Sequence, residues 1–228
     1  MAIKIENVVT PSAEQWGAII RGTRNPMNSW NKSDSYYTYV EDAETLQTAP
    51  FEFFVGDADL ALMKKLVKAG TDHRKFMRMI TVYVDVTSHH GWWAEADTYK
   101  VGTVRNSCSK MHTIHIKEFC KDDFSHEGID EVGDIATETF EQTIKTLEQL
   151  RIAFNKTGEK KYWRAIIELL PLGYNIRATL MLNYEVLANI YHSRKAHKLD
   201  EWHDFCRWIE ILPYSELITG GNADEMQP

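Results

Sequence analysis

FMRMITVYVDVT, residues 76–87, is the stretch that decides the fold. Its branched apolar residues occupy every second position, which is the period expected of a half-buried strand. The apolar set is Ile80, Val82, Val84 and Val86, alternating with Met79, Thr81, Tyr83 and Asp85. We therefore predict a strand here, and MHTIHIKEF at 111–119 is a candidate for a second strand.

Helical periodicity dominates the remaining chain. In DADLALMKKLVKAG we predict a helix over 57–69, with Asp57 as a possible cap and Gly70 at its end. After Asp134 apolar residues recur every three to five positions, which predicts a helix ending near Gly158. Three more helices are predicted over KKYWRAIIELLP (160–171), NIRATLMLNYEVLANIYHSR (175–194) and LDEWHDFCRWIEIL (199–212).

Strands early and helices late indicate an α+β fold, an antiparallel sheet with several packed helices. A parallel Rossmann sheet would need strands between the last helices, and we predict none there. The first fifty residues have weak periodicity and are predicted to form loops with short elements. No Ser/Pro/Gly-rich tract divides the chain, so we expect a single domain over 1–228.

Composition narrows the functional classes. The 228 residues are 43% hydrophobic and 26% charged, as in a globular protein, and the formal net charge is −7. No extended basic face is therefore available for a polynucleotide. An anionic ligand must be held by a few arginines and backbone amides in a local pocket.

Several features favour a cytoplasmic protein. No stretch approaches the roughly 18 apolar residues of a membrane span, and Glu6 interrupts the apolar residues of the start, MAIKIENVVTP. The cysteines are Cys108, Cys120 and Cys206. They form no CxxC pair, which argues against disulfides and against zinc held by thiolates.

Motifs of common chemistries are missing from the sequence. It contains neither GxSxG nor the phosphate loops GxGxxG and GxxxxGK[ST]. His112 and His115 would face opposite sides of a strand, and the adjacent His89 and His90 lack further ligands nearby in the sequence. We therefore expect no metal site.

The segment KVGTVRNSCSK, residues 100–110, combines cations with hydroxyls. Guanidinium forks, hydroxyls and exposed amides are the donors that a phosphate needs. Arg105, Ser107 and Ser109 are therefore candidates for binding a phosphate, although a solvated basic turn explains the composition equally well.

Polar residues also interrupt the apolar segment at 175–194. Asn183 and Asn189 lie six positions apart, and Arg194 follows. A buried amide must find partners, so each asparagine either bonds neighbouring chain or contacts a ligand. On residue chemistry alone we favour the structural role.

LLPLGYNIRATLMLNYEVLANIYHSRKAHKLDEWHDF, residues 169–205, resembles the C-terminal signature of the flavin-dependent thymidylate synthases. There a Leu-Pro-Leu stretch and an arginine precede an asparagine-bearing helix that ends in a Leu-Arg segment. The register holds without gaps from Leu170 to Arg194, and looser resemblance extends back to residue 57. The resemblance is to a divergent member, because WWAEADTYKVGTVRNSCSKMH lacks the family's Arg-His-Arg motif.

The resemblance implies a methyltransferase that acts on a small nucleotide. Family members assemble as homotetramers with flavin sites shared between subunits. They transfer a methylene group from methylenetetrahydrofolate to C5 of dUMP and reduce it with FAD hydride drawn from NADPH. The protein would then supply orientation and charge placement, while the cofactors supply the reactive groups.

The resemblance also implies individual roles. Arg194 matches the arginine that positions and polarises the nucleotide base, and would be the catalytic residue. Arg78 stands where the family usually has histidine in a Phe-Glu-His segment, and His197 lies near a family histidine beside the flavin. The flavin-binding set is Arg78, Asn183, Asn189 and His197. The substrate-binding set is Arg105, Ser107, Ser109 and Arg194.

Two other functions remain open at this stage. Folate-dependent hydroxymethylation of dUMP or dCMP would use water in place of hydride to complete the reaction. A nucleotide-binding homologue could keep the scaffold and lose catalysis, which the replaced Arg-His-Arg motif permits.

Overall fold

The computed structural model describes residues 3–41 and 48–220, and side chains outside 40–41 and 48–51. Its contacts divide the chain into two compact units, each built from three segments. Unit 1 comprises residues 1–6, 85–98 and 105–179. Unit 2 comprises residues 7–84, 99–104 and 180–228. The single domain over 1–228 stays a prediction.

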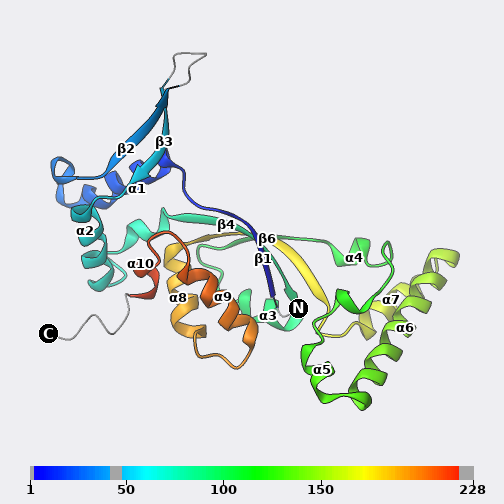
Figure 1. Cartoon of the computed structure of the whole chain (residues 1–228). Helices are drawn as coiled ribbons and strands as arrows, with labels where there is room; N and C mark the ends of the chain where they lie inside the picture. Colours follow the sequence, from blue (N-terminus) through cyan, green and yellow to red (C-terminus); the bar gives the residue numbers. More distant parts are fainter. Residues whose placement is uncertain (1–2, 42–47, 221–228) are drawn as a thin grey trace. The chain divides into compact units, whose positions relative to one another are not determined.

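Strands and helices alternate irregularly along the chain (Figure 1). The strands are β1 (Ile3–Val9), β2 (Tyr36–Glu41), β3 (Thr48–Phe54), β4 (Thr81–His89), β5 (Val104–Ser107) and β6 (Asn175–Asn183). The α-helices are α1 (Ala13–Arg24), α2 (Asp57–Lys68), α3 (His90–Ala96), α4 (Lys110–Thr113), α5 (Glu127–Val132), α6 (Asp134–Thr157), α7 (Lys160–Leu169), α8 (Tyr184–Arg194), α9 (Asp200–Glu210) and α10 (Glu216–Thr219). Short 3-10 helices are η1 (Asn25–Met27), η2 (Trp30–Lys32), η3 (Lys75–Arg78) and η4 (Lys121–Asp123).

The α+β class, with an antiparallel sheet and several helices, is confirmed. Four strands form a sheet in the order β1-β4-β6-β5, and β2 pairs antiparallel with β3 in a hairpin. The predicted strand is confirmed as β4, whose buried face carries Val82, Val84 and Val86. It begins at Thr81 rather than at residue 76, because Lys75–Arg78 form η3.

The prediction of a helix over 175–194 is wrong in its first half. Residues 175–183 form β6, and only Tyr184–Arg194 are helical, as α8. The buried residues of β6 are Ile176, Ala178, Leu180 and Leu182. Their period of two is a strand signal, so the inference that no strand lies between the last helices is wrong as well.

Two further predictions need correction. MHTIHIKEF is not a strand: it runs from α4 into turns. Therefore His112 and His115 are not arranged as in a strand. The first fifty residues contain more regular structure than expected, because α1 alone spans 12 residues. Its N-terminus carries a capping box, with Ser12 and Gln15 bonding each other's backbone amides, a signal readable in the sequence.

The remaining helix predictions are confirmed as α2, α6, α7 and α9. Gly56, not Asp57, occupies the N-cap position of α2. Gly158 ends α6 with a left-handed conformation (φ 68°), as expected of glycine at this position. No helix in the described ranges is both long and apolar enough to cross a membrane.

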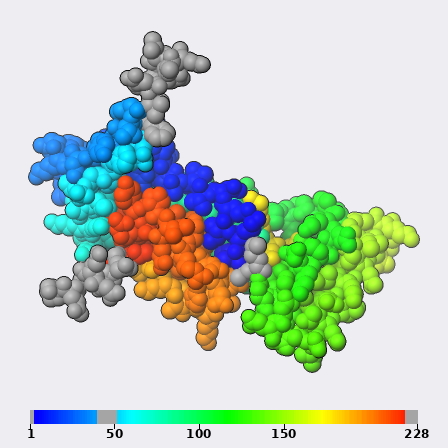
Figure 2. All heavy atoms as spheres, viewed as in Figure 1, coloured from blue at the N-terminus to red at the C-terminus, as the bar shows by residue number. Residues whose placement is uncertain are grey.

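The core of unit 1 lies beneath α5, α6 and α7, which Figure 2 shows in green to yellow-green. Three phenylalanines form its centre: Phe124 lies with its ring centroid 5.5 Å from that of Phe140 and 6.5 Å from that of Phe119. Leu147 of α6 and Ile166 of α7 are fully buried against them. This apolar contact joins α6 and α7 to the rest of unit 1.

Unit 2 contains a buried ion pair between α1 and α2. Arg24 Nε lies 2.5 Å from Asp59 Oδ1, and both side chains are almost fully buried. The other carboxylate oxygen of Asp59 accepts hydrogen bonds from the hydroxyls of Ser33 and Ser35. Burial alone would raise the pKa of Asp59, but these bonds and Arg24 outweigh it and hold the pKa below the ordinary value of 3.8.

We predict that Asp59→Asn destabilises the protein by about 3–5 kcal/mol, because it leaves the Arg24 charge buried and unpaired. The lowered pKa means that the carboxylate stabilises the fold above the ordinary value of 3.8 and that this contribution is lost as the pH falls below it. Free energies of unfolding in urea, measured at pH values above and below 3.8, should fall more steeply with acid for the wild type than for Asp59→Asn. Asp57→Asn, at an exposed position of the same helix, is the control, and equal costs for the two variants would contradict the prediction.

Candidate functional site

A cavity of about 420 Å³ in unit 1 contains the predicted phosphate-binding residues. Arg105, Ser107 and Ser109 all line it, together with His90 and Lys110. The volume lies within the usual range of about 300–1,000 Å³ for ligand pockets. Arg105, Ser107 and Ser109, which the sequence placed at alternate positions of one segment, therefore line the same cavity.

Local chain geometry explains how the cavity forms. Strand β5 brings Arg105 and Ser107 to the sheet, and the backbone N–H of Cys108 donates to the carbonyl of Arg177 at 3.0 Å. The chain then turns into α4, which begins at Lys110. On the facing helix α3, the indole N–H of Trp93 donates to the carbonyl of Ile176 at 3.0 Å and so ties that helix to β6.

Arg105 is held rigidly at the wall of this cavity. One guanidinium nitrogen donates to both carboxylate oxygens of Asp97, at 2.8 and 2.7 Å. The guanidinium carbon lies 3.8 Å from the ring centroid of Trp93, a cation–π contact. Its Nε is buried and has no hydrogen-bond partner within the described part of the chain. Arg105 is therefore oriented in advance and keeps an unsatisfied donor.

Lys110 adds a second cation to the same cavity, and it contacts His90. Lys110 Nζ lies 2.9 Å from His90 Nε2. Burial lowers the pKa of both groups, and for His90 the nearby charges of Lys110 and Arg105 lower it further. The sequence offers His90 only as a candidate metal ligand, because its contact with Lys110 leaves no local signal. Among the described residues no His/Cys/Asp/Glu cluster is suited to a metal.

Arg194 lies at the end of α8 in unit 2, between two aromatic side chains. Its Nε donates to the hydroxyl of Tyr99 at 2.8 Å. Its guanidinium carbon lies 4.8 Å from the ring centroid of Trp202 and 5.5 Å from that of Tyr99. Trp202 is fully buried, so it offers Arg194 a rigid surface. Tyr99 was missed from the sequence, where nothing distinguishes it from other tyrosines.

His197 is brought close to Arg194 through Trp202. The His197 ring centroid lies 6.4 Å from that of Trp202, and His197 Nδ1 accepts the backbone N–H of Leu199 at 3.2 Å. Two members of the predicted nucleotide and flavin sets therefore flank one tryptophan.

The asparagines predicted to bind flavin differ in their surroundings. The side-chain oxygen of Asn183 accepts the backbone N–H of Val186 at 3.0 Å and caps α8. Its amide faces Gly102, which adopts the left-handed conformation (φ 86°). Asn189, in the middle of the same helix, is exposed. Asn183 thus has the structural role that residue chemistry favoured, and flavin binding by both stays a prediction.

Arg78, the fourth residue of the flavin set, is exposed at the end of η3. This short helix packs against α8, and Arg74, the residue before η3, forms an ion pair with Glu185 of α8 at 3.1 Å. The flavin set lies in unit 2 and the phosphate set in unit 1. Their joining in one site stays a prediction.

Comparisons with known proteins place the fold. No protein-family model matches the chain, and no curated protein matches its sequence. A solved structure of thymidylate synthase X (ThyX) from Helicobacter pylori with FAD and dUMP superimposes with a TM-score of 0.63 at 14% identity, covering 96% of this chain and 98% of that one. A second structure of the same flavin-dependent enzyme, complexed with FAD and dUMP, gives 0.61 at 14% identity over 96% and 99%. The chain therefore has a ThyX-like fold.

We predict that Gly102→Ala destabilises the protein more than Gly70→Ala does. Both glycines have positive φ (86° and 97°), and strain of this kind costs on the order of 1–3 kcal/mol. At Gly102 the added Cβ would also overlap the amide of Asn183, whereas nothing lies within 4 Å at Gly70. Free energies of unfolding in urea measure the difference, and equal losses would show that Gly102 does not contact the N-cap of α8.

Proposed function

We propose that this protein is a divergent ThyX-like methyltransferase that modifies C5 of dUMP. One observation carries the proposal: Arg105, Ser107 and Ser109, which the donor chemistry of their segment marked as phosphate-binding candidates, line one cavity in a chain with a ThyX-like fold. FAD and dUMP are the molecules named with both solved structures that it resembles.

The cavity suits the phosphate of a nucleotide. The buried Nε of Arg105 lacks a partner in the described structure, and Ser107 and Ser109 are exposed. Guanidinium and hydroxyl donors form charge-assisted bonds to phosphate oxygens. Lys110 adds a charge that no carboxylate of the described residues neutralises. In a chain of net charge −7, this local positive charge would attract an anion that the overall field repels.

Arg194 would act on the pyrimidine ring. A guanidinium that donates to a ring carbonyl stabilises negative charge as it develops on the ring, most effectively in a site that excludes water. The hydrogen bond to Tyr99 and the face of Trp202 hold Arg194 in one orientation. This preorganisation lowers the cost of reaching the transition state.

The flavin-binding set also suits the group proposed for it. Amide, guanidinium and imidazole groups can donate to the carbonyl and phosphate oxygens of FAD, and Arg78 and Asn189 are exposed. When bound, FAD supplies the hydride that reduces the one-carbon unit of methylenetetrahydrofolate, with NADPH as the source of electrons. The protein's own residues bind and orient these molecules, in the homotetramer that the family resemblance implies.

A second candidate is a nucleotide-binding homologue without catalysis. Where the family has its Arg-His-Arg motif, this chain carries a segment beginning Trp92-Trp93, and both indoles are buried in the core. Buried indoles cannot replace the charges of that motif. The phosphate cavity could therefore persist without turnover.

The purified protein is expected to bind flavin, visible as the absorbance of the cofactor's own ring system. With dUMP, methylenetetrahydrofolate and NADPH it should form a product in which a methyl group replaces the hydrogen at C5, a net gain of CH2 that mass spectrometry detects. A hydroxymethyl adduct would instead identify the folate-dependent hydroxymethylase. Neither bound flavin nor flavin uptake in the presence of dUMP would overturn the flavin assignment, and dUMP binding without turnover would support the second candidate.

Arg194→Ala is predicted to weaken dUMP binding by about 2–5 kcal/mol, as expected for loss of a buried charge-assisted contact. Arg207→Ala is the matched control, because Arg207 is exposed on α9 and pairs with Asp204 there. Arg194→Lys should recover part of the loss, since it keeps the charge but lacks the donor to Tyr99. Titration calorimetry with dUMP measures all three, and unchanged affinity in Arg194→Ala would refute the role of Arg194.

A further inference from the structure

The contact between His90 and Lys110 has an unusual balance of charge. Lys110 Nζ lies 2.9 Å from His90 Nε2, and both side chains line the cavity of unit 1. Asp97 is the one carboxylate among the described lining residues, and both of its oxygens accept from Arg105. The pair of His90 and Lys110 therefore lacks a counter-ion in the described structure.

This contact restricts the protonation of His90. An ammonium group has donors but no acceptor, and a protonated imidazole likewise has only donors. A hydrogen bond from charged Lys110 to Nε2 therefore requires His90 to be neutral, with its proton on Nδ1. The low pKa of His90 agrees with this state: burial lowers it first, followed by the charges of Lys110, Arg105 and His89.

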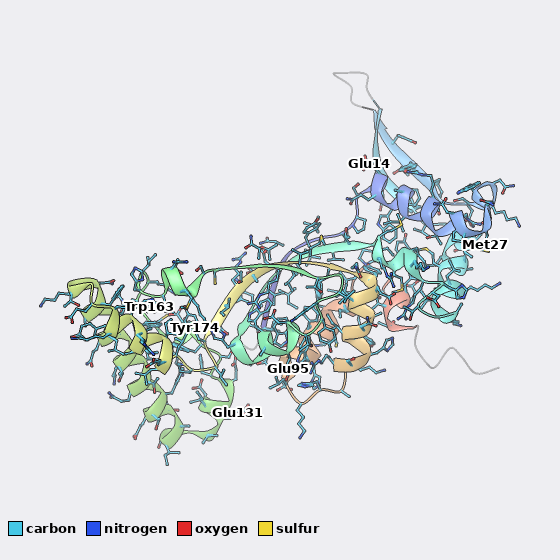
Figure 3. All side chains as sticks on the ribbon, turned by 180° about the vertical axis from the view of Figure 1, so that it is seen from behind. Glu14, Met27, Glu95, Glu131, Trp163 and Tyr174 are labelled. Atoms are coloured by element: carbon cyan, nitrogen blue, oxygen red, sulfur yellow. The ribbon has the colours of Figure 1, made fainter. Side chains whose placement is uncertain are left out.

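The other groups that face His90 do not relieve this restriction. Tyr174, labelled in Figure 3, lies with its ring centroid 6.3 Å from that of His90, and burial raises its pKa so that the phenol stays neutral. His89 accepts the backbone N–H of Trp92 through Nδ1 at 3.3 Å. The titratable and charged groups that face His90 or line its cavity are His89, Asp97, Arg105, Cys108, Lys110 and Tyr174.

A doubly charged anion in the cavity would reverse this balance. A phosphate monoester carries about −1.5 to −2 charges near neutral pH. Its oxygens would accept from Lys110 and thereby release Nε2 of His90. A negative charge bound next to the imidazole favours its protonated form.

We propose that His90 is a positioning residue for Lys110, and that the pair takes up a proton when a phosphate monoester dianion binds in this cavity. Before binding, neutral His90 holds the ammonium group of Lys110 in the cavity. On binding, Lys110 turns its N–H groups to the ligand, and Nε2 of His90 accepts one proton from solvent. No covalent bond of the ligand breaks. The inference rests on the proposed function only in taking dUMP as the physiological monoester.

Titration calorimetry on the full chain tests the proposal. Methyl phosphate and dUMP are titrated near pH 7.5 in two phosphate-free buffers with different ionisation enthalpies, and the difference in heat gives the number of protons exchanged. The wild type should take up a fraction of a proton with either ligand. His90→Gln should lose this uptake, because Gln can accept from Lys110 but cannot titrate.

Variants of Lys110 test the other half of the pair. Lys110→Gln should weaken methyl phosphate binding about 10- to 100-fold, the effect of removing one charge-assisted bond. Lys110→Arg should restore part of the affinity. Lys160→Gln removes the same charge from an exposed position on α7 that does not line the cavity. As the control it should change affinity by less than about twofold, as for a solvent-exposed charge screened by salt.

A measurement on the unmodified protein covers the case in which a variant fails to fold. In the protein without ligand, long-range ¹H–¹⁵N NMR should show the imidazole proton of His90 on Nδ1. With methyl phosphate bound, the same measurement should show a higher pKa of His90. Absence of proton uptake in the wild type, uptake retained in His90→Gln, an unchanged His90 pKa, or no binding of either ligand would overturn the proposal. Ligand binding with proton uptake but without turnover would support the role of His90 and contradict the proposed enzymatic function. Turnover of dUMP without proton uptake on binding would support the enzymatic function and contradict the role of His90.

Discussion

The passage from β6 into α8 is the constraint on which the arrangement of unit 2 depends. The backbone N–H of Tyr184 donates to the carbonyl of Ile80 at 3.0 Å, and Asn183 caps the first turn of the helix. The hydroxyl of Tyr184 donates to the carbonyl of Pro213. The bonds of Asn183 and Tyr184 thus fix the direction in which α8 begins. That direction sets where Arg194, at the far end of the helix, meets Tyr99 and Trp202.

The two candidate clusters hold their arginines in the same way. Arg105 lies over Trp93 and bonds Asp97, while Arg194 lies near Trp202 and bonds Tyr99. An aromatic face and one polar anchor restrict a long side chain whose ordering otherwise costs about 2 kcal/mol in rotamer entropy. A ligand that binds to either guanidinium would meet a group already in place. Preorganisation of this kind suits a protein that orients reactants for chemistry carried by other molecules.

Charge in the cavity of unit 1 is local and only partly balanced. Asp97 neutralises Arg105, whereas Lys110 faces a neutral histidine. A fully paired site would offer an anion little net attraction, and the charges of fully exposed lysines would be screened by salt. Here Lys110 carries the charge, and His90, as an uncharged acceptor, orients it. Such a site favours a ligand that brings its own negative charge.

Much of the fold could be read from local pattern. A single apolar stripe marks α2, α6, α7 and α9, and strict alternation marks β4. The segment at 175–194 misled because Ile176 and Leu180 lie four positions apart, a spacing that fits a helix as well as a strand. Pairing with β4 and β5 resolves that ambiguity in favour of the strand, in agreement with the alternation of buried residues along β6.

The sequence by itself determined the α+β class and the types of residue that could hold a phosphate, because periodicity and donor chemistry are local properties of the chain. Only the tertiary structure decided the partners of those residues. Trp93 and Asp97 orient Arg105, and His90 meets Lys110, which lies twenty positions further along the chain. The physical reason is that side chains meet where strand pairing and helix packing bring their backbones together, and those contacts depend on the whole fold.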